Sequence, residues 1–190
     1  GSPTMNQSPR SVIGLLTVFS ALYLLPLIWS PGPGHLALCV GLFFTVIGSS
    51  AVLLACLGVR GRAPTKQGLA FVGLTSGLEF LAVAAGLIAG FVWDAWWLLG
   101  ALLLSSVLLH FLAMTYAFRR PIDFFLLPVI CASAGIAWLA DREDPLTAWG
   151  YAGGLAAGAC TSYALALMWG ARRNNRAGSN HADPGAGAFS

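Results

Sequence analysis

Residues 68–93 read GLAFVGLTSGLEFLAVAAGLIAGFVW, and this stretch decides the fold class. A helix needs about 20 mostly apolar residues to cross a hydrocarbon layer roughly 30 Å thick, and this segment is long enough to do so. It holds a single ionisable side chain, that of Glu79. Its apolar residues do not alternate strictly with polar ones, so it fits a helix and not a strand of a membrane barrel. The segment is predicted to span a membrane.

The composition of the whole chain agrees with this prediction. Its 190 residues are 57% hydrophobic and 9% charged, with a mean hydropathy of +0.77. An ordinary soluble domain carries about 25% charged residues. We therefore expect an integral membrane protein whose surroundings are membrane lipids, with no nucleic acid partner and no separate soluble domain.

Further apolar stretches predict an all-α membrane protein with six transmembrane helices. We interpret residues 1–4 as an expression scar, 5–11 as a cytoplasmic N-terminus, 12–173 as the transmembrane domain and 174–190 as a disordered tail. The expected spans are Val12–Trp29, Leu36–Val59, Gly68–Trp93, Ala95–Phe118, Ile122–Ala140 and Thr147–Ala171.

The basic residues predict the orientation of these spans. In a six-span arrangement nine of the ten Lys and Arg residues fall on one side, and Arg142 falls on the other with most of the acidic residues. Cytoplasmic loops carry an excess of Lys and Arg, so both termini are expected in the cytoplasm of a cell with the protein in its inner membrane. The nine are Arg10, Arg60, Arg62, Lys66, Arg119, Arg120, Arg172, Arg173 and Arg176.

Sliding the second span onto the sixth by 112 residues superposes Ser50 on Ser162 and Arg60 on Arg172. The matches favour a bundle built from repeated helical hairpins. The alternative is that these spans simply run in the same direction and end in basic residues.

Small residues recur every four positions in two spans. Such ridges let helix backbones approach closely, so they predict packing within one chain or between copies in a homo-oligomer, with the lining of a narrow pathway as the alternative. The helix-packing candidates are Gly73 and Gly77 in the third span, and Gly150, Gly154 and Gly158 in the sixth.

Glu79 and His110 are the ionisable side chains placed deep in the apolar spans. A charge at the bilayer centre costs at least about 2.5 to 3.5 kcal/mol, which makes both residues leading candidates for a functional site. At 1.5 Å per residue their depths differ by about 6 Å, and the short turn at Asp94 makes their spans neighbours, so a contact between them is an open question.

Several hydroxyl groups complete the predicted transport pathway, although such groups often serve only to bond a helix carbonyl or a neighbouring helix. They are Thr75, Ser76, Ser106, Ser50 and Ser162. No catalytic motif is present in the sequence, and the dispersed Cys39, Cys56, Cys131 and Cys160 predict neither a disulfide nor a metal site. We expect no enzyme activity and no cofactor.

The stretch from Gly68 to Phe80, with Thr75-Ser76 at its centre, resembles the third span of the acetate uptake transporter family. The segment from Leu99 to Arg173 is similar to the last three spans of that family in length and in its basic turn at Arg119-Arg120. The N-terminal signature is reduced here to Ser8-Pro9-Arg10-Ser11-Val12-Ile13-Gly14-Leu15. The resemblance implies six spans and uptake of a small monocarboxylic acid.

Two hypotheses for function follow. The first is a channel or proton-coupled transporter for a small solute, such as a short monocarboxylic acid or a small neutral molecule. A buried glutamate beside a histidine suits proton coupling. The alternative is a non-transporting membrane protein, similar to stress-associated proteins of the HdeD type or docking a partner, in which the polar residues are structural.

Overall fold

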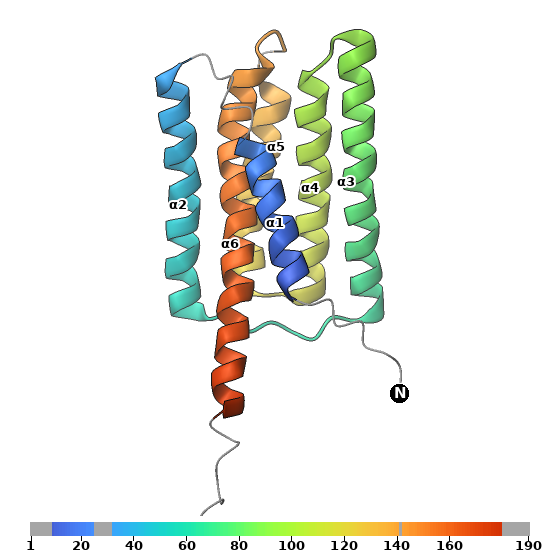
Figure 1. Ribbon diagram of the computed structural model, residues 1–190. Helices are drawn as coiled ribbons and strands as arrows, with labels where there is room; N and C mark the ends of the chain where they lie inside the picture. The colour runs from blue at the N-terminus through green and yellow to red at the C-terminus, as the bar shows by residue number, and fades with distance from the viewer. Residues whose placement is uncertain (1–8, 25–31, 141, 180–190) are drawn as a thin grey trace, which may run out of the picture.

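The computed structural model describes residues 9–24, 32–140 and 142–179, and within these ranges every regular element is a helix. The helices are α1 (Pro9–Leu24), α2 (Pro33–Leu57), α3 (Lys66–Trp93), α4 (Trp97–Phe118), α5 (Pro121–Leu139) and α6 (Pro145–Ser179) (Figure 1). All but α1 are long and apolar enough to cross a membrane. The described part of α1 has 16 residues, and the rest of the expected first span lies outside the described residues.

Helix α6 is the central element of the bundle, and α1, α2 and α5 pack directly on it. Small residues make the close approach to α2 possible. A Cβ atom added to Gly154 would lie 2.7 Å from the carbonyl oxygen of Cys39, and one added to Gly158 would lie 2.9 Å from Cβ of Val46. Gly154 and Gly158 of the expected ridge therefore pack against α2 within the chain.

Helix α1 covers the next face of α6. Gly153 faces the backbone of Tyr23, because a Cβ there would come within 2.6 Å of the Tyr23 carbonyl oxygen. About two turns further along α6, the hydroxyl of Thr161 donates to that of Ser20 at 3.0 Å. The indole Nε1 of Trp149 also donates to the Tyr23 carbonyl at 3.2 Å. These contacts fix the side of α1 that faces the bundle.

Helix α3 stands at the edge of the bundle and packs mainly on α4. Gly86 and Gly90 bring the two helices together near their connection, since a Cβ on either glycine would lie 2.6 Å from Leu99 or Trp96. Gly73 and Gly77 instead face outward, where an added Cβ would meet no atom within 4 Å. Among the described residues these two glycines do not pack against another helix, so packing between copies stays a prediction for them.

The loop from α2 to α3 crosses under the C-terminal end of α4. Arg62 donates from Nη2 to the Tyr116 carbonyl at 2.7 Å and from its backbone N–H to the Phe118 carbonyl at 2.9 Å. A basic side chain at a helix C-terminus satisfies free carbonyls and offsets the helix dipole. Gly61 is required here, because a Cβ would clash with the Phe118 carbonyl oxygen.

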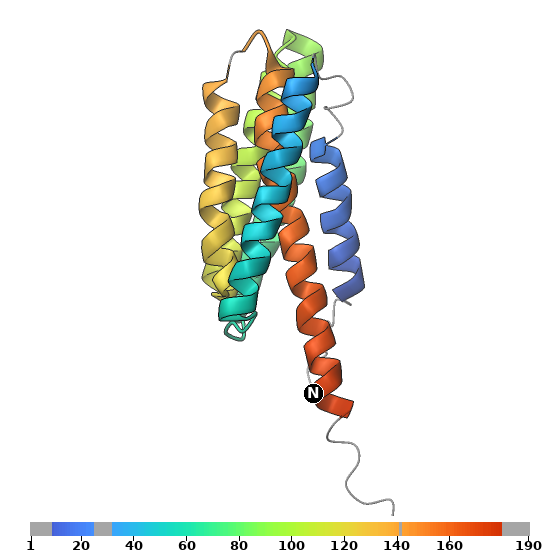
Figure 2. The same ribbon diagram turned by 90° about the vertical axis from the view of Figure 1, so that its left-hand side faces the viewer.

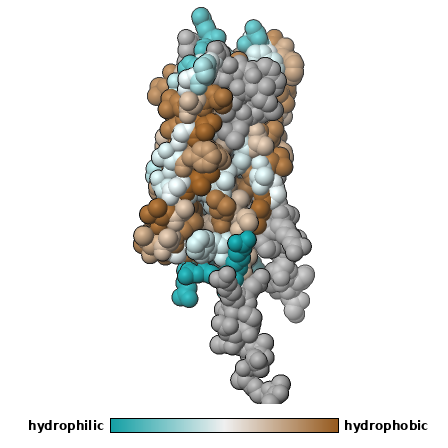
Figure 3. All heavy atoms as spheres, turned by 60° about the vertical axis from the view of Figure 1, so that its left-hand side comes forward, coloured by the Kyte–Doolittle hydropathy of each residue, from teal (hydrophilic) through white to brown (hydrophobic). Residues whose placement is uncertain are grey.

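Charged residues gather at the two ends of the bundle, and the flank between them is largely apolar (Figure 3). The lower end in Figure 1 holds the end of α2, the start of α3 and the turn between α4 and α5. Arg60, Arg62, Lys66, Arg119 and Arg120 belong to these segments. An apolar belt between two charged ends fits a multi-pass membrane protein.

The helix boundaries differ from expectation most at the C-terminus. Helix α6 continues to Ser179 (Figure 2), through residues 174–179 for which we expected disorder. Extending a helix that is already anchored by packing adds one backbone hydrogen bond per residue without a new nucleation cost. The structure thus continues the helix into the expected tail as far as Ser179, and the remainder of the tail lies outside the described residues.

Candidate functional site

Glu79 lies at the midpoint of α3 and turns toward α4. Its residue is 8% exposed. The hydroxyls of Thr75 and Ser76 precede it by one turn on the same helix, and His110 approaches from α4. We call these four residues the Glu79 cluster. Its members come from the two helices whose glycines allow close packing, so the cluster is embedded in the α3–α4 interface.

The hydrogen bonds of the cluster orient His110. Nδ1 of His110 lies 3.1 Å from Oγ1 of Thr75 and 3.3 Å from Oγ of Ser76. Both hydroxyls donate to backbone carbonyls of their own helix, Thr75 to Val72 at 3.0 Å and Ser76 to Val72 at 3.0 Å. Because a hydroxyl has one proton to donate, these oxygens accept from the ring. On this geometry we assign a proton to Nδ1 of His110.

The Glu79 carboxylate faces the same ring nitrogen. Its Oε1 lies 3.9 Å from Nδ1 of His110, and the exposed fractions of the two side chains are 11% and 18%. Within the described residues the carboxylate has no hydrogen bond. An ionised carboxylate at such a site is costly unless it is paired, so the charges of the acid and the base depend on each other.

Two residues that the sequence did not single out lie near Glu79. The phenol of Tyr23 on α1 and the thiol of Cys160 on α6 both come within electrostatic range of the Glu79 carboxylate. Tyr23 is 1% exposed, and among the described residues its hydroxyl is the buried side-chain oxygen without a hydrogen-bond partner. The buried interior thus also holds polar groups from α1 and α6.

No signal in the sequence marks Tyr23 or Cys160. A tyrosine and a cysteine inside apolar spans are ordinary packing residues. Their proximity to Glu79 depends on how α1 and α6 dock against each other, which follows from the tertiary contacts of Gly153 and Trp149 described above.

The other expected pathway residues lie elsewhere. Ser50 of α2 donates to Ser162 of α6 at 2.7 Å, and their exposed fractions are 2% and 0%. This pair sits in the α2–α6 interface and is not part of the Glu79 cluster. The buried hydroxyl of Ser106 donates at 2.7 Å to the carbonyl of Leu103 in its own helix. The structure thus brings together Thr75, Ser76, Glu79 and His110, and separates Ser50 and Ser162 from them.

A second buried polar group lies at the basic end of the bundle. Asp123 is fully buried and accepts hydrogen bonds from the Tyr163 hydroxyl at 2.6 Å and from Nη2 of Arg120 at 3.0 Å. It also accepts from the backbone N–H of Arg120 at 2.8 Å, which caps the start of α5. Every oxygen of this carboxylate has a partner, so the group ties α5 to α6.

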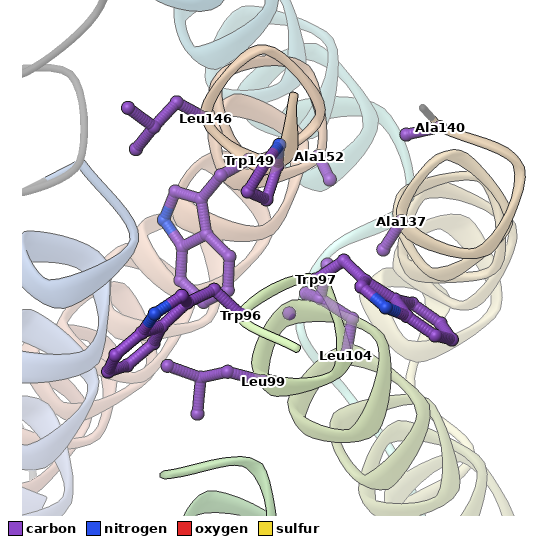
Figure 4. Close-up of a pocket in the computed structure, with 11 residues that line it drawn as sticks. Trp96, Trp97, Leu99, Leu104, Ala137, Ala140, Leu146, Trp149 and Ala152 are labelled. Carbon is purple, nitrogen blue, oxygen red and sulfur yellow. The ribbon is translucent and has the colours of Figure 1, made fainter. Parts of the chain in front are cut away.

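An apolar pocket of about 400 Å³ opens at the opposite end of the bundle. Figure 4 shows Trp96 and Trp149 on one side of it and Trp97 on the other, next to Ala137 and Ala140. The ring centroid of Trp149 lies 6.2 Å from that of Tyr23. The wall of this pocket is therefore also a neighbour of the buried Tyr23.

The described residues contain no group of three His, Cys, Asp or Glu side chains that is arranged to hold a metal ion. A comparison of the chain with protein-family models, with curated proteins and with solved structures finds no match. The resemblance to the acetate uptake transporters therefore stays a prediction from the residues quoted above.

Proposed function

We propose that the chain is a channel or proton-coupled transporter for a small solute in the inner membrane of a cell, with both termini in the cytoplasm. The observation that carries this proposal is the intramembrane pairing of Glu79 with His110, whose Oε1 and Nδ1 atoms lie 3.9 Å apart. Ionisable side chains within transmembrane segments are costly and mark ion, proton or substrate sites. An acid and a base at this distance couple their protonation, because the charge of each changes the free energy of charging the other.

Unfilled hydrogen-bonding capacity around the pair supports solute binding. The Glu79 carboxylate accepts no hydrogen bond from a described residue, and the Tyr23 hydroxyl has no partner among them. Buried polar groups are normally satisfied, and each exception calls for an explanation such as a water, an ion or a ligand. A small solute with a hydrogen-bonding group would satisfy either of them.

The charge of the site restricts which solutes fit. No Lys or Arg occurs between residues 67 and 118, so the cluster has no fixed cation for a permeating carboxylate. A monocarboxylic acid would cross as the neutral acid, or beside a protonated His110 and a neutral Glu79. A small neutral molecule would cross without this requirement.

The rival function, a non-transporting membrane protein, is favoured by Ser50 and Ser162. These residues bond to each other in a sealed helix interface and hold α2 against α6. If the Glu79 cluster serves the same purpose for α3 and α4, its loss would weaken assembly without affecting any flux. The two functions therefore predict different outcomes for one substitution.

The test is solute flux into proteoliposomes holding the full chain, with radiolabelled acetate and urea as probes and with or without an imposed pH gradient. Glu79→Gln removes the acid and keeps the shape of the side chain. We expect wild-type flux of one probe well above that of empty vesicles, and at least a tenfold loss for Glu79→Gln with unchanged yield and oligomeric state. Glu143→Gln makes the same change in the exposed loop before α6 and should keep the flux.

Two outcomes would contradict the proposal. The first is a wild-type flux of both probes that equals the flux into empty vesicles. The Glu79 cluster would then have only a structural role. Equal flux in Glu79→Gln and wild type would remove Glu79 from the transport step. A fall in melting temperature for Glu79→Gln in the absence of any wild-type flux is the result that the rival function predicts.

A further inference from the structure

A groove of about 570 Å³ runs between α2 and α6 toward the basic end of the bundle, well apart from the α3–α4 interface. Its floor is formed by Ser50 and Ala51, and its walls are apolar. The wall residues are Leu54, Leu165, Met168 and Trp169. The groove opens on the flank that is expected to face lipid, so acyl chains are the apolar material available to fill it.

Two arginines close the lower end of this groove. Arg172 and Arg173 line it where α2 has ended at Leu57 and α6 continues alone. Nη1 of Arg173 lies 4.0 Å from the position of a Cβ atom on Gly58, the residue that ends α2. The two guanidinium groups therefore stand beside the mouth of the groove, at the level where the apolar belt gives way to the charged end.

Neither arginine is neutralised by the described part of the chain. Among the described residues the side chains of Arg172 and Arg173 take part in no hydrogen bond or ion pair, whereas Arg120 is paired with Asp123. Both are exposed. Arginine binds phosphate oxygens through a planar fork of N–H donors, which makes a phosphate group the natural partner for such a pair.

Trp169 is a third residue of the groove that is typical of the headgroup level of a membrane. Its side chain lines the groove one turn before the arginines, and the residue is 53% exposed. Tryptophan is enriched at the headgroup level of membranes because its ring is apolar and its N–H group is polar. From the floor outward, the groove thus presents apolar walls, an interfacial indole and then two cations.

We propose that the α2–α6 groove binds one anionic phospholipid of the cytoplasmic leaflet, with its phosphate on Arg172 and Arg173 and an acyl chain along Leu165 and Met168. The charge complementarity between two free cations and an anionic headgroup carries this assignment, together with the apolar groove that begins directly above them. Basic pockets between transmembrane helices on the cytoplasmic side are sites of this type. The lipid would join α2 to α6 below the Ser50–Ser162 contact.

The test is native mass spectrometry of the full chain in detergent with added dioleoyl phosphatidylglycerol or dioleoyl phosphatidylcholine. The two lipids share their acyl chains, so the comparison isolates the headgroup charge. We expect one phosphatidylglycerol bound per chain, at least tenfold more tightly than phosphatidylcholine. A basic side chain at a membrane surface contributes about 1 kcal/mol, so Arg172→Gln with Arg173→Gln should weaken binding by roughly 30-fold.

Two further variants separate the groove from general surface charge. Lys66→Gln removes one positive charge from the same end of the bundle but lies outside the groove, and it should change lipid binding by less than twofold. Ala51→Trp fills the floor and keeps both arginines, and it should weaken phosphatidylglycerol binding by at least tenfold. Ala51 is exposed, so the larger ring does not enter the helix core. The melting temperature of each variant without lipid reports whether it is folded.

Several results would overturn the proposal. Equal affinity for the two lipids would show that the headgroup charge does not contribute to binding. Wild-type binding in the double arginine variant, or an equal loss in Lys66→Gln, would show that these arginines are not the site. Displacement of the lipid by inorganic phosphate at the same concentration would indicate a free-anion site. A dimer lost in Ala51→Trp would make the groove an interface between copies.

Discussion

Nδ1 of His110 lies 3.9 Å from Oε1 of Glu79, and the same nitrogen lies 3.1 Å from Oγ1 of Thr75. The ring nitrogen therefore faces the acidic Glu79 and the neutral hydroxyl oxygens of Thr75 and Ser76, all on α3. A change in the charge of Glu79 acts on the His110 ring through a single N–H group. This relationship links the protonation of the two residues, whichever solute the site takes.

The first prediction concerns the tautomer of His110. The hydroxyl protons of Thr75 and Ser76 are used by the Val72 carbonyl, so the neutral ring should carry its proton on Nδ1 and leave Nε2 unprotonated. Nitrogen-15 NMR of the labelled chain in lipid distinguishes the two neutral tautomers. Thr75→Val combined with Ser76→Ala removes both hydroxyl acceptors, leaves the Glu79 carboxylate in place, and should raise the population of the Nε2–H form. A wild-type ring protonated on Nε2 alone would contradict the assignment.

The second prediction compares a glycine that lies against a neighbouring helix, Gly154, with one that faces outward, Gly77. Gly154→Ala places a Cβ 2.7 Å from a backbone oxygen of α2, so the helices must separate, and we expect a loss of about 1 to 3 kcal/mol in stability. Gly77→Ala is the matched control because a Cβ there meets no atom within 4 Å. Its better helix propensity should leave stability unchanged or raise it by up to about 1 kcal/mol.

Thermal unfolding of the purified chain in detergent compares these two variants. Equal melting temperatures for Gly154→Ala and Gly77→Ala would contradict the tight α2–α6 contact. A large loss for Gly77→Ala accompanied by a change in oligomeric state would instead place Gly77 in a contact between copies. That result would support the homo-oligomer expected from the sequence.

The sequence predicts much of this architecture because its strongest signals are local. Span length and apolar composition locate the helices, and the cost of burying charge selects Glu79 and His110 before any contact is known. Their similar depth follows from the 1.5 Å rise per residue and the short turn at Asp94. These arguments need no knowledge of which helices are neighbours elsewhere in the bundle.

The remaining features depend on the rotation of each helix about its axis, which apolar spans do not encode. A soluble helix shows its inner face by its pattern of polar residues, but a span that is apolar all round does not. Ser50 and Ser162 could therefore be grouped with Glu79 on the sequence alone, whereas they bond to each other in another interface. Tyr23 was missed for the same reason.

The third prediction concerns the buried carboxylate of Asp123. Asp123→Ala removes the partner of both Arg120 and Tyr163 and should lower stability by about 3 to 5 kcal/mol, because the Arg120 guanidinium is left partly buried without a counter-charge. Tyr163→Phe removes one hydrogen bond to a charged acceptor and should cost about 1.5 to 3 kcal/mol. Chemical or thermal unfolding in detergent measures both. A smaller loss for Asp123→Ala than for Tyr163→Phe would refute the role given to the carboxylate.

The fourth prediction concerns pH and the start of α6. The hydroxyl of Thr147 donates to Oδ2 of Asp144 at 2.6 Å, and its backbone N–H donates to Oδ1 at 3.2 Å. These bonds favour the ionised carboxylate and hold the pKa of Asp144 below its ordinary value of 3.8, with the hydroxyl bond as the larger cause. Because the folded-state pKa is lowered, the cap stabilises the helix start above pH 3.8 and is lost as the pH falls through the lowered pKa.

Carbon-13 NMR of the Asp144 carboxyl group measures this titration, and the Thr147 amide signal should follow the same curve in the wild type. Thr147→Val removes the larger cause and should move the midpoint up toward 3.8, while Asp144→Asn should abolish the pH dependence of the Thr147 amide. Asp144 is exposed and lies just before α6, not inside a span. Solute flux at neutral pH should therefore not change in either variant. A wild-type midpoint at or above 3.8 would show that Thr147 does not hold the carboxylate in its ionised form.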